Sequence, residues 1–132
     1  MHKFDLIFCC FPGCIVACNK AVYEGGDYKT IAHISYAGNI KLYVKPDHIP
    51  EADMEAIKRT AARERQKTQE RLEKTLSPAL PFWQYDKNYW NLLEECRNYS
   101  PWEKGDQLYD SLKDKTQDEK KSILIDYYLT NF

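Results

Sequence analysis

The hydrophobic pattern of this chain changes its period once, at Pro50, and this change constrains the fold more than any other feature. Before it, apolar residues alternate with polar ones, as Ile40, Leu42 and Val44 do, which is typical of half-buried strands. After it, residues 51–76 contain neither glycine nor proline and are rich in strong helix formers. Strands followed by helices in this order predict an α+β fold with helices on one face of a sheet.

We expect residues 1–46 to form an antiparallel β-meander of about four strands. Residues that favour turns interrupt the apolar runs, notably at Pro12-Gly13 and at Gly25-Gly26. With Pro12-Gly13 as the two turn residues of the first hairpin, Cys9 would lie opposite Val16.

The helical part, residues 51–132, should begin with one long charged helix over residues 51–76. About three shorter helices should follow the segment 77–83, which contains two prolines. We expect a single domain of 132 residues, because this length is ordinary for one domain. The apolar stripe of the long helix is thin and consists of Met54, Ile57, Ala61, Leu72 and Leu76.

Three signals predict where the shorter helices begin. Asp86 is a suitable N-cap for the first of them. Ser100-Pro101-Trp102-Glu103 matches a capping box with proline at the first helical position. Thr116-Gln117-Asp118-Glu119 matches a second capping box, which would open the last helix.

Four of the five cysteines fall within residues 9–18. Alternation in a hairpin places Cys9, Cys14 and Cys18 on one face, but Cys14 and Cys18 would then lie about 13 Å apart along their strand. Because the sulfurs of a zinc site lie within ~2.3 Å of one ion, a regular hairpin does not bring these two thiols together. We therefore interpret the cysteines as small core residues, with a thiol or metal site at Cys9, Cys14 and Cys18 as an alternative.

A lipid-attachment site is a further interpretation of this segment. Residues 15–18 resemble a lipobox that ends at Cys18, but Pro12-Gly13 interrupts the apolar region in front of it. The lipoprotein interpretation is therefore disfavoured. The uncharged run over residues 6–19 is also shorter than the ~18–20 residues of a membrane span.

The long helix carries a basic ridge with a spacing of three to four residues. In a helix, this spacing aligns the cationic groups along one side. We interpret the ridge either as a solvated face or as a contact surface for nucleic-acid phosphates. The basic ridge consists of Arg59, Arg63, Lys67, Arg71 and Lys74.

The segment 81–90, PFWQYDKNYW, is unusually rich in aromatic residues. Trp83, Tyr85 and Trp90 cannot easily all face one core from a single short segment. Those that stay exposed would serve as anchors for a protein partner or as stacking platforms for single-stranded bases. Packing of these rings against the sheet is the alternative.

Composition sets further bounds on the function. The net charge of −1 produces no global attraction to nucleic acid or to anionic lipid. An odd number of clustered cysteines suits a reducing cytosol better than a secreted disulfide framework. His33 in a strand has no identifiable catalytic partner, and no cofactor motif is present, so we expect neither an enzyme nor a bound cofactor.

The run GGDYKTIAHISYAGNIKLYVKPDHIP, followed by a charged helix, resembles small uncharacterised proteins of phages and integrative mobile elements of Gram-positive gut bacteria. The resemblance covers residues 9–65 and includes no catalytic motif. It implies a cytoplasmic accessory protein that acts on the machinery of the host or of the element.

These observations predict a small cytoplasmic, non-enzymatic protein-interaction module. In the setting that the resemblance implies, it would regulate or inhibit a host or defence protein. The alternatives are a nucleic-acid-binding accessory that uses the basic ridge, and a thiol or metal protein that uses the N-terminal cysteines.

Overall fold

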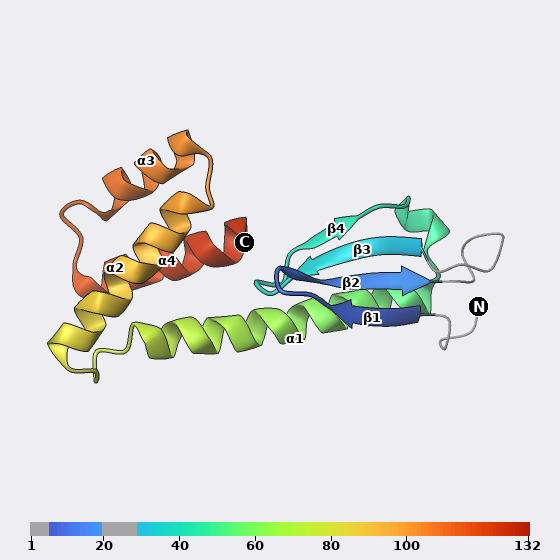
Figure 1. The fold of residues 1–132 in the computed structure, drawn as a ribbon, viewed down its shortest axis with the longest axis horizontal. Helices are drawn as coiled ribbons and strands as arrows, with labels where there is room; N and C mark the ends of the chain where they lie inside the picture. The colour runs from blue at the N-terminus through green and yellow to red at the C-terminus, as the bar shows by residue number, and fades with distance from the viewer. Residues whose placement is uncertain (1–5, 20–28) are drawn as a thin grey trace. The chain divides into compact units, whose positions relative to one another are not determined.

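A computed structural model describes residues 6–19 and 29–132 and confirms the α+β prediction. An antiparallel sheet of strands β1–β4 precedes the helices α1–α4 (Figure 1). The chain divides into two compact units, with the boundary between Gln66 and Lys67. The expectation of one domain stays a prediction.

The four strands follow one another across the sheet in chain order, as a meander requires. Cys9 pairs with Val16, and the backbone N–H of Phe11 donates to the carbonyl oxygen of Cys14 over 2.9 Å. The predicted register of the first hairpin is therefore confirmed, while the predicted Gly25-Gly26 turn lies outside the described residues. The strands are β1 (Leu6–Cys10), β2 (Cys14–Asn19), β3 (Lys29–Ser35) and β4 (Ile40–Leu42).

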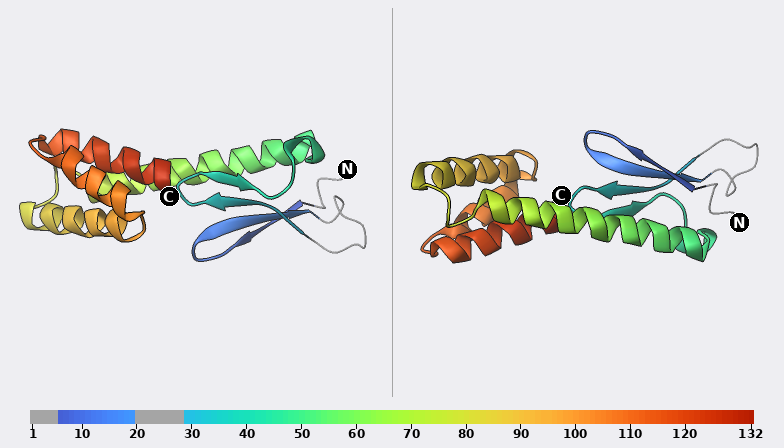
Figure 2. Two further views of the ribbon diagram at one scale, coloured as in Figure 1. Left: turned by 90° about the horizontal axis from the view of Figure 1, so that it is seen from above. Right: turned by 90° about the horizontal axis from the view of Figure 1, so that it is seen from below.

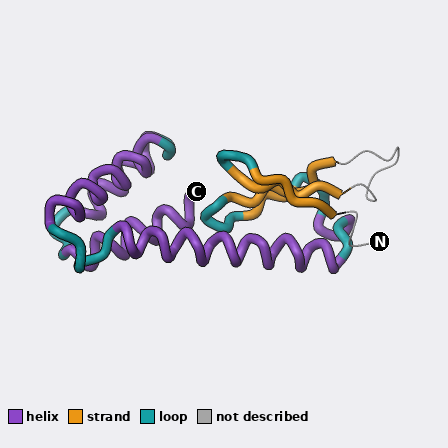
Figure 3. Tube along the Cα trace, turned by 60° about the horizontal axis from the view of Figure 1, so that its bottom comes forward, coloured by secondary structure: helices purple, strands orange, loops and turns teal. Residues whose placement is uncertain are grey.

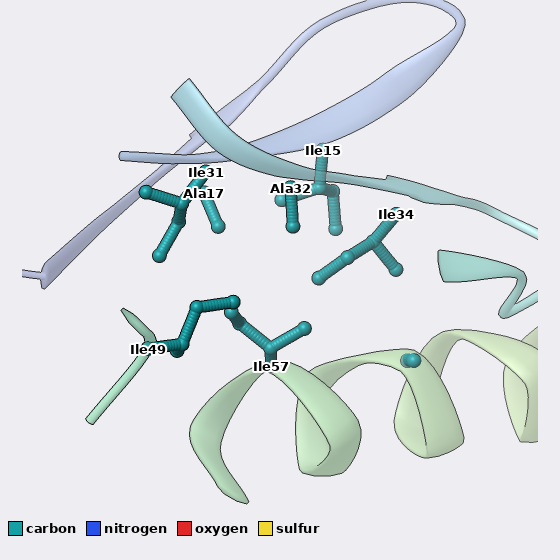
Figure 4. Packing of buried hydrophobic residues seen from close by; sticks show 8 residues of the cluster. Ile15, Ala17, Ile31, Ala32, Ile34, Ile49 and Ile57 are labelled. Atoms are coloured by element: carbon teal, nitrogen blue, oxygen red, sulfur yellow. The ribbon is translucent and has the colours of Figure 1, made fainter. Parts of the chain in front are cut away.

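The core of the first unit lies between one face of the sheet and α1 (Glu51–Thr75) (Figure 2). Ile57 points from α1 toward the sheet, as Figure 4 shows. A bulge between β2 and β3 at Ala17 and Cys18 lets two consecutive residues of β3 become buried. The buried cluster consists of Ile15, Ala17, Ile31, Ala32, Ile34, Ile49, Ile57 and Ala61.

The interpretation of the N-terminal cysteines as core residues is wrong. Strand β2 buries Ile15 and Ala17 against α1, and because side chains alternate, Cys14 and Cys18 lie on the face that points away from this helix. Both are only half-buried, and so is Cys9, while Cys10 is exposed. The β1–β2 hairpin also lies farther from α1 than β3 and β4 do (Figure 2).

The second unit contains the C-terminal end of α1 and three shorter helices, shown in purple in Figure 3. Their apolar faces pack on one another, and Leu72, Leu93, Cys96 and Leu124 are fully buried. In the described part of the chain, no helix combines the length and the apolar character that a membrane span requires. The helices are α2 (Phe82–Asn98), α3 (Trp102–Leu112) and α4 (Gln117–Asn131).

One of the three predicted helix starts is wrong, and a second helix, α3, begins at Trp102 beside the predicted position but without the predicted cap. Helix α2 begins at Phe82 directly after Pro81, so Asp86 lies inside the helix and not at its N-cap, because the fixed φ of proline suits a helix start. Ser100 does not cap α3; its Oγ accepts a 2.5 Å hydrogen bond from the Tyr127 hydroxyl.

The capping box at α4 is confirmed. The Thr116 backbone N–H donates to Glu119 Oε1, and the Glu119 backbone N–H donates to Thr116 Oγ1, each over 3.2 Å. These reciprocal bonds satisfy two donors at the helix start, and the predicted position of this helix is therefore correct.

Candidate functional site

The three aromatic residues of α2 that the sequence analysis identified differ in their exposure to solvent. Trp83 and Trp90 are 68% and 53% exposed, whereas Tyr85 is only 8% exposed. The two tryptophans are seven residues apart, which is close to two helical turns, so they lie on the same side of α2. Tyr85 lies on the buried face, together with Tyr89, Leu92, Leu93 and Cys96.

The environment of Cys96 shows that solvent is excluded from the buried face of α2. Its side chain is fully buried, and burial, with a smaller contribution from Glu95, raises the pKa of its thiol to about 12. Because this face packs on α3 and α4, the side that carries Trp83 and Trp90 remains free for contacts with other molecules.

Two charged residues lie between the exposed tryptophans. Asp86 and Lys87 are both exposed, and neither has an ion-pair partner among residues 6–19 and 29–132. The four residues follow the spacing i, i+3, i+4 and i+7, which defines one side of a helix. We refer to Trp83, Asp86, Lys87 and Trp90 as the tryptophan stripe.

Beside the tryptophan stripe, a cavity of about 220 Å³ opens between α2 and the first turn of α4. The rings of Tyr85 and Tyr89 are stacked with centroids 6.5 Å apart, and Trp90 meets Tyr89 edge-on at 5.4 Å. The volume is below the ~300–1,000 Å³ of pockets for drug-sized ligands, so it suits a single side chain. The cavity is lined by Phe82, Tyr85, Asp86, Tyr89, Trp90, Gln117 and Lys120.

Tyr85 lines this cavity, and its hydroxyl is buried without a hydrogen-bond partner among residues 6–19 and 29–132. Burial raises the pKa of Tyr85, Asp118 adds to this increase, and the nearby Gln117 side chain opposes it. Gln117 nevertheless does not form a hydrogen bond of normal length and angle with the hydroxyl. An unpartnered buried hydroxyl is energetically costly.

Further exposed aromatic side chains lie at both ends of α2. Phe82 is 79% exposed at the start of the helix. Tyr99 and Trp102, which flank the connection between α2 and α3, are 78% and 77% exposed. The helical unit therefore presents five large aromatic side chains that are more than half exposed.

The basic ridge is divided between the two units, because Arg59 and Arg63 precede the boundary and Lys67, Arg71 and Lys74 follow it. All five side chains are exposed. Neither unit therefore carries all five side chains of the basic ridge.

Arg63 and Arg71 each have a partner on their own unit. Arg63 Nε lies 3.8 Å from Glu64 Oε1. Arg71 Nη2 donates to the Tyr128 hydroxyl over 3.3 Å, and its guanidinium carbon lies 5.6 Å from the centroid of that ring. Arg71 therefore contributes to the packing of α4 on α1.

The open face of the sheet carries the half-buried thiols and His33. The Tyr43 hydroxyl lies 3.1 Å from His33 Nδ1, and the two ring centroids are 4.6 Å apart. Cys18 Sγ lies 4.0 Å from Thr30 Oγ1. In the part of the chain that the structure describes, no three His, Cys, Asp or Glu side chains are placed to hold a metal ion.

The sequence analysis missed Asp86 and Lys87 as surface residues, and it missed Gln117 and Lys120 as cavity residues. The symmetric spacing W-x₂-D-K-x₂-W was visible in residues 83–90 and could have indicated the first pair. No sequence signal placed α4 beside α2, because that contact depends on tertiary packing. Comparison of the chain with protein-family models, with curated proteins and with solved structures finds no match.

Proposed function

We propose that this chain is a small non-enzymatic protein-interaction module and that its helical unit carries the binding surface. The observation behind this proposal is the exposure of Phe82, Trp83, Trp90, Tyr99 and Trp102, each by more than half of its surface. Tryptophan and tyrosine dominate the energetic centres of protein interfaces, because each ring buries a large area at a small entropic cost.

Exposure of large aromatic rings to water is energetically unfavourable, and a purely structural role does not explain it. Large apolar rings in water favour association, and clusters of them commonly mark interaction sites. The net charge of −1 does not direct the chain toward nucleic acid or anionic lipid. A protein is therefore the class of partner that this surface fits best.

The biological setting of the proposal is a cytoplasmic accessory protein of a phage or mobile element. In that setting the partner is a host or defence protein whose activity the module regulates or inhibits. The resemblance of residues 9–65 to such accessory proteins supports this setting, and the exposed aromatic residues supply the means of binding.

An affinity capture from lysate of the native host, with and without nuclease, tests this function. We expect a stoichiometric protein that remains bound after nuclease treatment and that is lost with the Tyr99→Ala/Trp102→Ala variant. A matched control is Tyr109→Ala, which changes a half-buried ring of α3. Recovery of nucleic acid alone, or capture that is unchanged by the aromatic substitutions, would contradict the proposal.

Nucleic-acid binding through the basic ridge is the second candidate function, supported by the exposure of all five cationic side chains. Binding of this kind weakens steeply with salt, because each neutralised phosphate releases counterions. Arg63→Glu should then abolish it, while Lys113→Glu at the C-terminal end of α3 should not. Binding that is absent or insensitive to salt would eliminate this candidate.

A further inference from the structure

Strand β1 forms one edge of the sheet and, within residues 6–19 and 29–132, pairs only with β2. Its sequence, LIFCC, contains no charged residue and no proline, and Ile7, Phe8 and Cys10 are exposed. An apolar edge strand presents backbone N–H and C=O groups that favour pairing with another strand, and proteins usually protect such edges. An edge without this protection indicates a binding surface.

Strand β4, at the opposite edge, is protected. It has only three residues, and Lys41 in its middle is exposed. Lys45 and Pro46 follow it in the sequence. Short length, lysine and proline are devices by which proteins prevent the pairing of edges. Of the two edge strands of this sheet, β1 is therefore the one open to a further strand.

The register of the first hairpin determines which residues of β1 present their backbone groups at the free edge. The Phe11 N–H donates to the carbonyl oxygen of Cys14 in β2, and the pairing of the two strands continues without a shift to Leu6. Because backbone groups alternate between the two sides of a strand, those of Ile7 and Cys9 also point toward β2. The backbone groups that point away from β2 are those of Leu6, Phe8 and Cys10.

We propose that β1 binds β1 of a second copy of this chain in antiparallel orientation, which joins two four-stranded sheets into one. The two-fold axis is perpendicular to the sheet and passes between the two Phe8 residues. Each Leu6 then lies opposite Cys10 of the other copy. Every opposed pair exchanges two N–H···O bonds, so all outward-pointing residues of β1 receive partners. This pairing uses the first unit and is independent of the aromatic residues proposed to bind a partner protein.

Only this register engages all three outward-pointing residues. A shift by one residue opposes them to residues whose backbone groups point toward β2. A shift by two residues in one direction places Leu6 opposite Pro12, which has no N–H to donate. The same shift in the other direction moves Cys10 past the start of the strand at Leu6.

The side chains of β1 favour a second copy as the occupant of this edge. A two-fold interface places side chains near the axis against their own counterparts, where like charges would repel, and β1 carries no charge. Phe8 lies on the α1 side of the sheet, because it pairs with the buried Ala17, and it is 37% exposed. The rotation keeps each face of the sheet on its own side, so it brings the two Phe8 rings together. On the open face, Ile7 comes opposite Cys9 of the second copy.

The two edges of the sheet also set the size and strength of the assembly. Because β4 is protected, the pairing closes at two copies and does not continue into a fibre. Pairing of two five-residue strands removes on the order of 600–800 Å² from water, less than the ~1,200–2,000 Å² of a standard stable interface. The dimer is therefore weak and reversible, and its detection requires low micromolar to submillimolar protein concentrations.

Sedimentation equilibrium of the full chain with charges introduced at Phe8 tests the pairing. Phe8→Glu places two glutamates opposite each other at the axis, and Phe8→Lys places two lysines there, so each variant should self-associate about tenfold or more weakly. An equimolar mixture places glutamate opposite lysine and should associate about three- to tenfold more tightly than either variant alone.

Ile40→Glu is the matched control for the Phe8 variants. Ile40 is also 37% exposed and belongs to the other edge strand, and its pairing with the buried Ile34 places it on the same side of the sheet as Phe8. This change should leave self-association as it is in the wild type. Circular dichroism of each variant establishes that the fold is retained.

Amide hydrogen exchange of the wild type tests the register. The N–H groups of Leu6, Phe8 and Cys10 become hydrogen-bonded in the dimer, so their exchange should slow about tenfold when nine tenths of the chain is dimeric. The N–H groups of Ile7 and Cys9 already point toward β2, and their exchange should change much less with concentration. This measurement needs no variant, so it decides the register even where a Phe8 variant fails to fold.

The pairing is overturned if the wild type is monomeric over the whole concentration range, if species larger than a dimer form, or if the mixture of Phe8→Glu and Phe8→Lys is as dissociated as either variant alone. A monomeric chain that loses a captured protein in Phe8→Glu would assign this edge to a strand of another protein and overturn the pairing as well. The proposed function fails separately, when capture of a partner does not depend on Tyr99 and Trp102.

Discussion

Gly38 lies directly against Arg65 of α1, in the turn between β3 and β4. A Cβ added at Gly38 would lie 2.5 Å from Arg65 Cβ and 2.7 Å from the carbonyl oxygen of Ala61. Arg65 Nη1 also donates to the carbonyl oxygen of Ala37 over 3.2 Å. The close approach at Gly38 and this hydrogen bond together hold the turn on the helix, so glycine is required at this position.

Gly38→Ala should lower the free energy of unfolding by roughly 2–4 kcal/mol. The residue has a φ of 87°, which side chains rarely adopt, and the added methyl group would meet backbone atoms that cannot move freely. Urea unfolding measures the effect. Gly13→Ala is the matched control, because a Cβ there meets nothing within 4 Å; equal effects of both changes would contradict the described contact.

The buried pair of Asn19 and Asp53 connects β2 to the start of α1. The Asn19 side-chain amide donates to the Asp53 carboxylate, and both side chains are buried. Asn19→Leu should lower the free energy of unfolding by roughly 1–3 kcal/mol, because it removes a donor from a buried carboxylate. Asn19→Leu/Asp53→Leu should cost less than the two single changes added together. Strict additivity in urea unfolding would show that the two groups are not coupled.

The thiols should differ sharply in their reactivity toward iodoacetamide in the native protein at neutral pH. Cys96 is fully buried with a pKa of about 12, so it stays a neutral thiol and should not react until the protein unfolds. Cys10 is exposed, and Cys9, Cys14 and Cys18 are half-buried on the open sheet face, so these should react first. Mass spectrometry of the alkylated peptides identifies each site, and all five should react in guanidinium. Protection of the N-terminal thiols equal to that of Cys96 would restore their interpretation as core residues.

The capping box of α4 should make stability depend on pH in the acid range. Hydrogen bonding to the Thr116 side chain, and then to its backbone N–H, lowers the pKa of Glu119 below its ordinary value of 4.5. A lowered folded-state pKa stabilises the protein above about that value, and this stabilisation is lost as the pH falls through the folded-state pKa. Thr116→Val should therefore destabilise the protein at neutral pH, raise the pKa of Glu119 in a carboxyl NMR titration, and lose part of its effect in acid. Thr130→Val, an exposed change in the same helix, is the control; an unchanged Glu119 titration in Thr116→Val would refute the capping contribution.

Local features were predictable from the sequence because they depend on neighbours along the chain. The change of period at Pro50 separated strands from helices, Pro12-Gly13 set the pairing of Cys9 with Val16, and Thr116 with Glu119 marked the start of α4. In each case, turn chemistry, capping or alternation acts within a few residues.

Tertiary packing decided which face of each element is buried. Both faces of β2 are apolar, so alternation alone could not select Ile15 and Ala17 over Cys14 and Cys18; the docking of α1 did. Likewise, residues 82–90 carry aromatic rings on more than one side of α2, and the contact with α3 and α4 buried Tyr85 and left Trp83 exposed. The sequence by itself determined the order and type of the elements, through local propensity and period. The tertiary structure alone decided which thiols and which tryptophans face solvent, because burial depends on contacts between segments that are distant along the chain.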